Sequence, residues 1–556
     1  MKRILLILPL YLFAVLPSSA QSWVDKAAKS VFTLKTFTAD GTMIASSNGF
    51  YIGTDGEAVS SYTPFINAQR AVIIDAQGKE QPVEEILGAN ETYDVVKFRV
   101  AARKTLPLPI ASTAANGTEI WLLPYAVKKT PACIKGTVTQ AEVFQNTYQY
   151  YTLQLTAEEN HISCPVLNGQ GEVIGIIQPA ASNQKETSYA VSARFAADLK
   201  ITGLSMNESS LKKITMTKAL PDTQDDALLA LFLASSSMTD SQYSNYVERF
   251  IQKFPRLAEG YINRARIRTA RKDFSGAEED MEQALSVAEN KEDTHYQYAQ
   301  LIYQKEVYQH DQPYSGWSFD KAYQEAQEAY NINPQPVYRQ QQAQIRYAQG
   351  QYAEAFNIYE ELTHSDLRSA DIFYAASMCK AQLKDTDQQI ALLDSAVNMF
   401  SRPYVKTAAP YLLARAQALY NAGRYRPAVN DYNEYGELMA AQLNAPFYYQ
   451  RELAEVGGHL YQQALNDIDK AIELSPSEPL YYAEKASLQV RVGKHQDAIA
   501  TAQQLIRLSP DFSDGYLFLG LAQCLTDQKA EGIQNLTKAK DLGNEQAQAL
   551  IDKYAK

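Results

Sequence analysis

A fixed period of 34 residues in the C-terminal part of the chain limits the fold more than any other feature. Three small residues, each 34 residues after the one before, mark this period: Ala464, Ala498 and Gly532. An apolar residue follows each of them seven positions later: Ala471, Leu505 and Ala539. A period of this length is typical of stacked helix pairs, in which each pair needs its neighbours to bury an apolar face. The sequence therefore predicts an all-α solenoid in this part.

One repeat unit can be followed through residues 482–510. The small residues Ala486 and Ala498 allow two helices to approach closely, Gly493 ends the first helix, and Pro510 stops the second. The same residue types recur at other places: Ala265/Phe274/Ala277/Ala284, Ala343/Tyr352/Ala355/Tyr359, Ala416/Gly423/Tyr425/Ala428 and Tyr461/Ala464/Ala471/Pro476. This pattern resembles the tetratricopeptide repeat. The resemblance implies about eight or nine units over residues 224–556, including a first unit that ends near Pro255.

The tetratricopeptide resemblance implies a binding surface and no catalytic machinery. In such arrays the first helices line a concave groove that takes an extended peptide or a partner helix. Counted from the repeat alanines, the groove positions are Arg266, Gln340, Gln344, Tyr347, Gln417, Tyr420 and Arg491. The alternative for each of them is ordinary solvated helix surface. Chaperone-tail members of the family clamp a carboxylate with Lys and Asn, and we do not expect that clamp because the corresponding places hold Ile262, Arg266, Leu413 and Gln417.

Short β-rich runs separated by turn residues fill residues 21–202. They are residues 30–34, 49–52, 71–75, 95–100, 119–124, 150–155 and 172–176. Strand runs at this spacing, with Asp-Gly and Asn-Gly turns between them, favour all-β barrels or a sandwich. Residues 203–223 lose this pattern and gather Ser, Asn, Lys and Pro, which predicts a linker before the helical part.

The order of motifs in residues 21–202 resembles the trypsin-like, double-barrel serine peptidases of the HtrA/Do type. The resemblance lies in an opening Gly-Phe-x-Ile-x-x-Asp-Gly segment, an Asp-led strand, the entry to a second barrel, a Pro-x-Leu-Asn-x-x-Gly-x-Val-Ile-Gly-Ile segment and a closing strand. These are residues 49–56, 93–98, 108–112, 165–176 and 188–191. The sequence as a whole is therefore expected to fold into an all-β trypsin-like double barrel followed by an all-α solenoid.

The same resemblance implies that Thr63, Asp94 and Ile162 stand where the family has its catalytic histidine, aspartate and serine. A hydroxyl nucleophile needs an adjacent base, and isoleucine has no lone pair at all. The family's glycine-rich oxyanion loop reads Asn-His-Ile-Ser-Cys at residues 160–164, without the glycines that its backbone geometry uses. We therefore expect a pseudopeptidase with no catalytic residues, in which Asp94 is a strand-end carboxylate bonded to backbone.

His161 is the single histidine between residues 21 and 294, and it adjoins the empty nucleophile position. One alternative is an unconventional dyad of His161 with Ser163 or Cys164, since a thiol needs only modest activation. A carboxylate pair in the helical part is another alternative for a working hydrolase. We expect instead that His161 is a solvated loop residue. Cys133 and Cys164 share this region, and they could form a disulfide or remain buried thiols.

Residues 1–20 read as a secretory signal, with Lys2 and Arg3 before an apolar run and small residues before Gln21. That run is shorter than a membrane span, and no second one follows, so we expect an exported soluble protein, periplasmic or envelope-associated. The formal net charge of −11 disfavours attraction to nucleic acid. The four cysteines lack C-x-x-C or Cys/His spacing, so we expect no metal and no cofactor.

These observations lead to one main hypothesis about function. The chain is expected to be an exported, non-catalytic scaffold that binds a protein or peptide through the solenoid groove and the degenerate peptidase cleft. Cell-envelope protein assembly or complex formation suits such a scaffold. A serine-peptidase-like hydrolase with an unconventional site is the alternative, and a third interpretation makes the first domain a cap on the solenoid. The sequence leaves the partner and the oligomeric state open.

Overall fold

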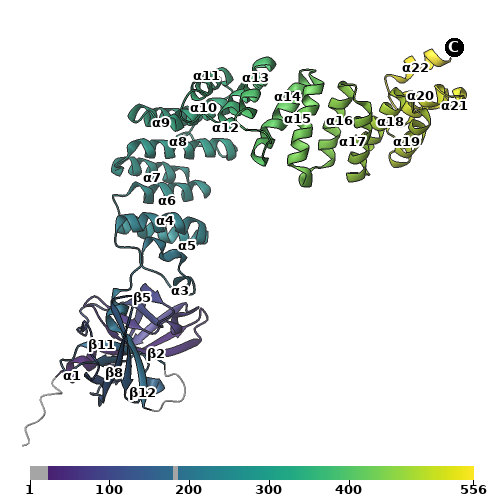
Figure 1. Cartoon of the computed structure of the whole chain (residues 1–556). Helices are drawn as coiled ribbons and strands as arrows, with labels where there is room; N and C mark the ends of the chain where they lie inside the picture. Colours follow the sequence, from purple (N-terminus) through teal and green to yellow (C-terminus); the bar gives the residue numbers. More distant parts are fainter. Residues whose placement is uncertain (1–22, 180–185, 556) are drawn as a thin grey trace, which may run out of the picture. The chain divides into compact units, whose positions relative to one another are not determined.

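The computed structural model describes residues 23–179 and 186–555 (Figure 1). The predicted signal sequence, residues 1–20, lies outside the described residues. Contacts divide the chain into two compact units, Met1–Ile267 and Arg268–Lys556, and each unit is described by itself. The helical part begins within the first unit, and the predicted limits of the linker, residues 203 and 223, remain predictions.

The first unit begins with a closed, antiparallel six-stranded barrel of strand order β1-β2-β3-β6-β5-β4. Its strands are β1 Val31–Phe37, β2 Met43–Tyr51, β3 Glu57–Ser60, β4 Arg70–Ile74, β5 Glu80–Asn90 and β6 Val95–Val100. Inward-facing residues that alternate along the strands, among them Phe32, Ile73 and Phe98, fill the interior. The β-branched and aromatic residues seen in the sequence are therefore core residues.

A second closed barrel follows, with strand order β10-β11-β12-β9-β8-β7. Its strands are β7 Glu119–Leu122, β8 Ile134–Phe144, β9 Tyr148–Gln154, β10 Pro165–Leu167, β11 Val173–Ile177 and β12 Thr187–Ser192. A separate apolar cluster that includes Phe50, Leu123 and Val191 draws on strands of both barrels and packs one against the other. The expected double barrel is confirmed.

Short helices and an extended segment complete the first unit. They are α1 Val24–Ala27, η2 Ala28–Ser30, η3 Thr63–Phe65, η4 Glu159–His161, α2 Ala193–Asp198, η5 Gly203–Asn207 and α3 Ser209–Lys212, followed by α4 Gln224–Ser237 and α5 Asp240–Lys253. Residues 211–219 lie against the first barrel, where Leu211, Ile214 and Met216 join its core. The backbone of Ile86 in β5 exchanges hydrogen bonds of 2.8 Å with Thr217 and Ala219, so this segment extends the sheet locally.

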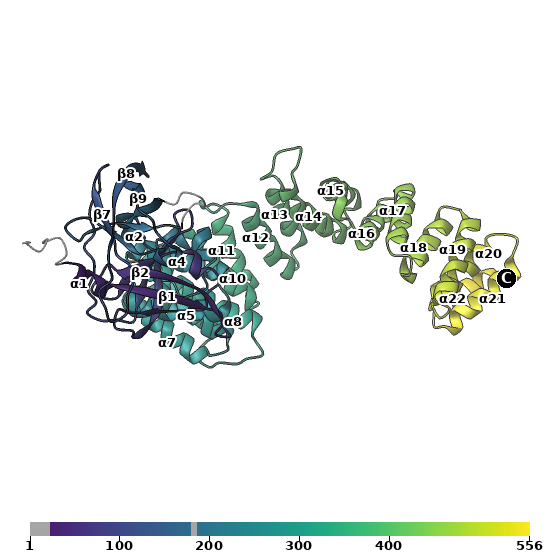
Figure 2. The same cartoon turned by 90° about the horizontal axis from the view of Figure 1, so that it is seen from below.

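Helix α6 spans Ala258–Ala270, across the division between the units, and the second unit is built from helix pairs (Figure 2). The helices are α7 Phe274–Val287, α8 Lys291–Tyr308, α9 Phe319–Ile332, α10 Pro336–Ala348, α11 Tyr352–Leu362, α12 Ala370–Gln382, α13 Thr386–Val397, α14 Ala409–Asn421, α15 Tyr425–Leu438, α16 Ala445–Gly457, α17 Tyr461–Leu474, α18 Pro479–Arg491, α19 His495–Leu508, α20 Ser513–Cys524, α21 Lys529–Asp541 and α22 Ala547–Tyr554. The expected solenoid of helix pairs is confirmed.

The predicted helix ends agree with the structure in the unit used to read the pattern. Helix α18 ends at Arg491, and Gly493 then adopts a φ of +78°, the left-handed conformation that favours glycine. Gly350 and Gly423 adopt the same conformation after α10 and α14. The turns within these pairs therefore follow from single glycines in the sequence.

Candidate functional site

The sequence resemblance assigns Thr63 and Asp94 to the positions of a catalytic histidine and aspartate. These two residues are hydrogen-bonded to each other. Thr63 lies in η3, just after β3, and Asp94 immediately precedes β6. Both the backbone N–H and the Oγ1 hydroxyl of Thr63 donate to Asp94 Oδ1, at 2.7 Å each. Burial raises the pKa of Asp94, and the hydrogen bonds from Thr63 oppose that rise. The pairing holds a carboxylate in place, but threonine has no group that titrates near neutral pH.

Ile162, which the sequence resemblance assigns to the nucleophile position, caps the short helix η4 and is half-buried. Asn48 of the first barrel holds this loop, because its Nδ2 donates to the carbonyl oxygens of Asn160 at 2.8 Å and of Ile162 at 3.0 Å. The loop is therefore ordered against the first barrel. The side chain it presents at this position is a hydrocarbon.

A buried group of three serine hydroxyls lies beside these two loops, and sequence reasoning missed it. Ser163 Oγ contacts Ser61 Oγ and lies 3.2 Å from Ser47 Oγ, while Ser47 and Ser61 are 3.3 Å apart. Ser61 also lowers the pKa of Asp94, against the larger effect of burial, so the group lies near the aspartate. Ser163 is 1% exposed and has a φ of +66°. Ser61 precedes Thr63 by two residues and Ser163 follows Ile162, so the group joins the two loops across the barrels.

The expectation that His161 is a solvated loop residue is wrong. His161 is 9% exposed, and its Nδ1 accepts a hydrogen bond of 3.0 Å from the backbone N–H of Glu158, closing a capping box on η4. Burial lowers the pKa of His161. The imidazole ring of His161 is thus held by a local hydrogen bond. In this bond it serves as the side-chain acceptor for a backbone N–H of the short helix.

Neither cysteine near this loop has the setting of a nucleophile. Cys164 is completely buried, and burial raises the pKa of its thiol to about 12. Cys133 lies half-buried, and burial raises the pKa of its thiol to about 11. Both cysteines are free in the structure, so the disulfide left open by the sequence is not formed here.

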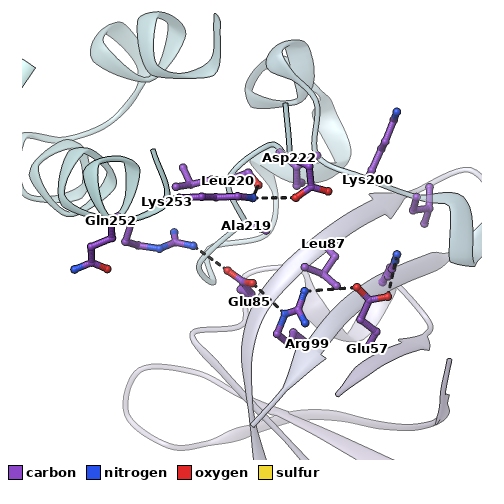
Figure 3. Close-up of a pocket in the computed structure, with 14 residues that line it drawn as sticks. Glu57, Glu85, Leu87, Arg99, Lys200, Ala219, Leu220, Asp222, Gln252 and Lys253 are labelled. Atoms are coloured by element: carbon purple, nitrogen blue, oxygen red, sulfur yellow. Dashed lines mark hydrogen bonds and ion pairs between the residues drawn. The ribbon is translucent and has the colours of Figure 1, made fainter. Parts of the chain in front are cut away.

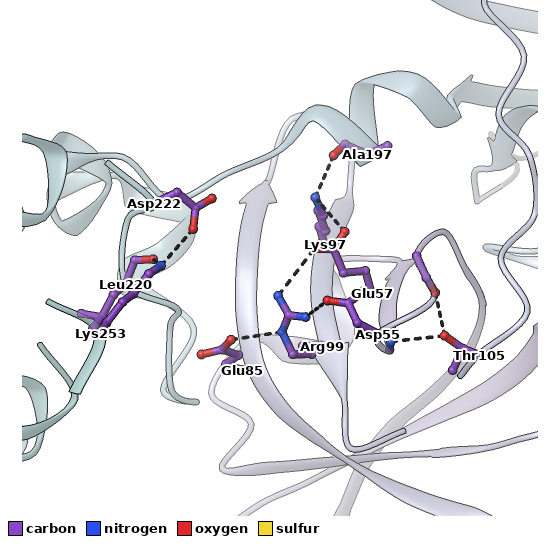
Figure 4. Close-up of polar contacts among 12 residues, drawn as sticks. Asp55, Glu57, Glu85, Lys97, Arg99, Thr105, Ala197, Leu220, Asp222 and Lys253 are labelled. Carbon is purple, nitrogen blue, oxygen red and sulfur yellow. Dashed lines mark hydrogen bonds and ion pairs between the residues drawn. The ribbon is translucent and has the colours of Figure 1, made fainter. Parts of the chain in front are cut away.

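Charged side chains line a cavity of about 460 Å³ between the outer face of the first barrel and α5 (Figure 3). Glu85 stands in the middle of it, with Oε1 at 3.3 Å from Arg99 Nε and Oε2 at 2.9 Å from Arg249 Nη2. Lys253 reaches Asp222 and the carbonyl oxygen of Leu220, each at 2.9 Å (Figure 4). Arg99, Arg249 and Lys253 already have acidic partners. We therefore interpret the cavity as part of a charged contact between the barrel and α5.

A larger cavity of about 750 Å³ lies between residues 201–218 and the helices α4 and α5. Its lining is mainly apolar and includes Leu211, Met216 and Tyr246. The hydroxyl of Tyr246 is buried there without a hydrogen-bond partner. No motif in the sequence predicted this cavity, because its walls come from segments without a recognisable pattern.

The predicted groove residues lie on first helices of the pairs, and none of them is fully buried: Arg266 on α6, Gln340, Gln344 and Tyr347 on α10, Gln417 and Tyr420 on α14, and Arg491 on α18. Tyr347 packs against Tyr352 and Tyr420 against Tyr425, with ring centroids 5.2 and 5.8 Å apart. Gln417 accepts a hydrogen bond of 3.4 Å from the hydroxyl of Tyr432. Their contact with a partner stays a prediction.

Two buried carboxylates beside this groove were missed by sequence reasoning. Glu452 and Glu455 lie on α16 and are 1% and 3% exposed, and the Oε2 atom of each lacks a hydrogen-bond partner. Burial, together with nearby carboxylates, raises the pKa of each to about 8. The sequence does contain a sign of Glu452, because this glutamate stands at a place where other repeat units have a small residue.

Within residues 23–179 and 186–555, no group of three or more His, Cys, Asp or Glu side chains is placed to hold a metal ion. No helix of the described part of the chain is long and apolar enough to cross a membrane.

Comparison with known proteins agrees with the helical part of this description. The sequence model of the tetratricopeptide repeat matches residues 341–404 and 483–547, so the chain contains tetratricopeptide repeats. Superkiller complex protein 3 of Mus musculus is 22% identical over 405 residues, 72% of this chain and 24% of that protein. Small glutamine-rich tetratricopeptide repeat-containing protein 2 of Mycosarcoma maydis is 30% identical over 82 residues, 15% of this chain and 23% of that protein. The chain thus spans about a quarter of the length of these relatives.

Two solved structures that are similar to this chain are described as proteases. A protease from M. tuberculosis in its active form is 17% identical, with 39% of this chain and 97% of that chain covered and a TM-score of 0.29. The serine endoprotease from Yersinia pestis is 14% identical, with 34% and 70% covered and a TM-score of 0.29. The assignment of the double barrel rests on its own strand order.

Proposed function

We propose that this protein is a non-catalytic, protein-binding scaffold in which a pseudopeptidase double barrel accompanies a tetratricopeptide solenoid. The observation that carries the proposal is the pairing of Thr63 with Asp94, two donor bonds of 2.7 Å at the place of a histidine–aspartate pair. Together with Ile162, it leaves no base and no nucleophile at the positions where a trypsin-like site needs them.

The proposed binding role rests on the helical part. Tetratricopeptide arrays present a groove to an extended chain, and the polar and aromatic groove residues suit adaptable contacts. A degenerate peptidase cleft also binds an extended chain by adding it to a strand edge, which needs no triad. The signal-like residues 1–20 support the part of this proposal in which the protein lies outside the cytoplasm and helps to assemble proteins of the cell envelope.

A hydrolase that uses His161 and Cys164 is the competing proposal. It requires an accessible thiolate, whereas Cys164 is fully buried and the acceptor nitrogen of His161 is already bonded to Glu158. These contacts favour the scaffold.

An affinity purification of the mature protein from its native envelope tests the scaffold. We expect a partner in stoichiometric amount, and we expect the eluted protein to cleave neither casein nor the partner during overnight incubation. A protein that elutes alone under gentle crosslinking, or one that cleaves the partner, contradicts the proposal.

A further inference from the structure

One helix pair of the second unit breaks a rule that its neighbours obey. Where two helices of a pair approach most closely, the first helix carries a small residue twelve positions before the small residue of the second helix. These first-helix residues are Ala343, Ala416, Ala486 and Gly520. The space is tight, because a Cβ added at Gly520 would lie 2.7 Å from the carbonyl oxygen of Gly532. In the pair α16/α17 the corresponding residue is Glu452.

The carboxyl group of Glu452 is poorly accommodated by the protein itself. It is 1% exposed, and its Oε2 atom has no hydrogen-bond partner. Glu455, one turn further along α16, also has an Oε2 atom without a hydrogen-bond partner. Its other oxygen, Oε1, lies 4.0 Å from Arg451 Nε. A buried carboxyl oxygen without a partner destabilises a fold, because it has lost its hydration and gained no hydrogen bond. Since alanine occupies this place in other units, packing alone does not explain why a glutamate stands here.

The neighbours of Glu452 point to a cationic ligand. Tyr420 of α14, Tyr449 of α16 and Glu484 of α18 all interact electrostatically with it. Glu484 is half-buried, and it lies near Asp514 at the start of α20. Arg491 is the cation among the groups that act on Glu452, and it is exposed. We call Tyr420, Tyr449, Glu452 and Glu484 the acidic groove segment.

We propose that the acidic groove segment binds a lysine or arginine side chain of an extended partner chain. The inference rests on the proposed scaffold function and names the chemistry of its partner. Glu484 and the two tyrosine rings are partly exposed and receive the cation, since an ammonium or guanidinium group is attracted to both carboxylates and aromatic faces. The carboxyl group of Glu452 then gains the partner that it lacks in the free protein. Tyr420 and Arg491 were also among the groove positions expected from the sequence.

Binding of a cation is expected to release the proton of the Glu452 carboxyl group. The cation favours the ionised form of Glu452, whose pKa in the free protein is about 8, and Glu455, Glu484 and Asp467 add further negative charge around it. Arg491 and Arg451 are the opposing cations on α18 and α16. Binding therefore releases protons, and affinity rises from pH 6 to pH 9.

The test uses the full chain and a fluorescein-labelled decapeptide of alternating alanine and lysine, with an alanine and glutamine decapeptide as the neutral probe. Fluorescence anisotropy at physiological salt measures both. Glu452→Gln and Glu484→Gln are expected to weaken the lysine peptide at least about ten-fold, as for loss of a charged hydrogen bond. Glu473→Gln removes an exposed charge on α17 and is the matched control, expected within two-fold of wild type. Binding that Glu452→Gln and Glu484→Gln leave within two-fold overturns the inference.

A second variant separates binding from folding. Glu452→Ala restores the small residue of the other units, so it is expected to raise the melting temperature while weakening the lysine peptide. A variant that melts lower than wild type contradicts the view that Glu452 is kept for a ligand. If the purified protein still captures a stoichiometric envelope partner but ignores the lysine peptide, this inference fails and the scaffold proposal stands.

Discussion

At the residue scale, the polar side chains around Thr63 and Asp94 form hydrogen bonds with one another. Asp94 receives two bonds from Thr63, and Ser163 lies among Ser47 and Ser61. The assignment of Thr63, Asp94 and Ile162 to the triad positions rests on flanking motifs that are contiguous in sequence, and it stays a prediction. The serine group could not be predicted, because Ser163 contacts Ser47 and Ser61 across more than one hundred positions of the chain.

Removing the central hydroxyl of this group tests its structural role. Ser163→Ala is expected to lower the free energy of unfolding of the first unit by about 2 kcal/mol, since a buried hydroxyl network loses its shared member. Urea unfolding followed by tryptophan fluorescence measures this. Ser112→Ala, at an exposed serine, serves as the control. If the losses in free energy of unfolding caused by Ser163→Ala and Ser61→Ala add up in the double variant, the direct contact between the two serines is contradicted.

The buried carboxyls predict an unusual dependence of stability on pH. Glu452 and Glu455 have a pKa of about 8 in the folded chain and 4.5 in the unfolded chain. Between pH 4.5 and 8 their carboxyl groups are therefore ionised mainly in the unfolded chain. The free energy of unfolding should therefore fall as pH rises through this window, by at most about 1.4 kcal/mol per pH unit for each group. Thermal unfolding at pH 5, 6.5 and 8, followed by far-ultraviolet circular dichroism, checks this. Glu452→Gln should flatten the fall, and stability that rises with pH in wild type contradicts it.

At the element scale, the sequence predicts elements with a strong pattern and misses those without one. The helix pairs follow from small residues and glycines such as Gly493. Strands β5 and β8 were missed, although each has 11 residues. β5 opens with Glu80-Gln81-Pro82, and β8 is largely exposed, so neither shows the continuous apolar run of a buried strand. Pairing with neighbouring strands decides their conformation.

The charged contact at Glu85 links α5 to the first barrel. Because Glu85 bonds both Arg99 and Arg249, Glu85→Ala should loosen α5 and the segment 214–219 while the barrel stays folded. Hydrogen–deuterium exchange in these two segments should rise several-fold. Glu80→Ala, which removes an exposed carboxylate 4.0 Å from Arg70, is the control. Unchanged exchange in Glu85→Ala shows that apolar contacts of Ile214 and Met216 suffice.

At the scale of the whole molecule, two architectures, a double barrel and a solenoid of helix pairs, share one chain. The double barrel has closed sheets and an ordered loop at residues 160–164, whereas helix α16 of the solenoid carries two buried glutamates, Glu452 and Glu455. The sequence predicts the solenoid from its 34-residue period, and it predicts the double barrel from its strand runs and the order of its motifs. It does not predict the acidic groove segment, whose members come from three helices and meet only in the folded chain.

The central claim is that the barrel is not a catalyst, and labelling the purified mature protein with a fluorophosphonate tests it most directly. Intact mass spectrometry reads out the result, with an active trypsin-like peptidase as positive control. The account predicts that the mass of the protein stays unchanged while the control is fully labelled. One label per chain, mapped to the peptide that contains residues 158–168, would contradict it and assign a working nucleophile to the loop around Ile162.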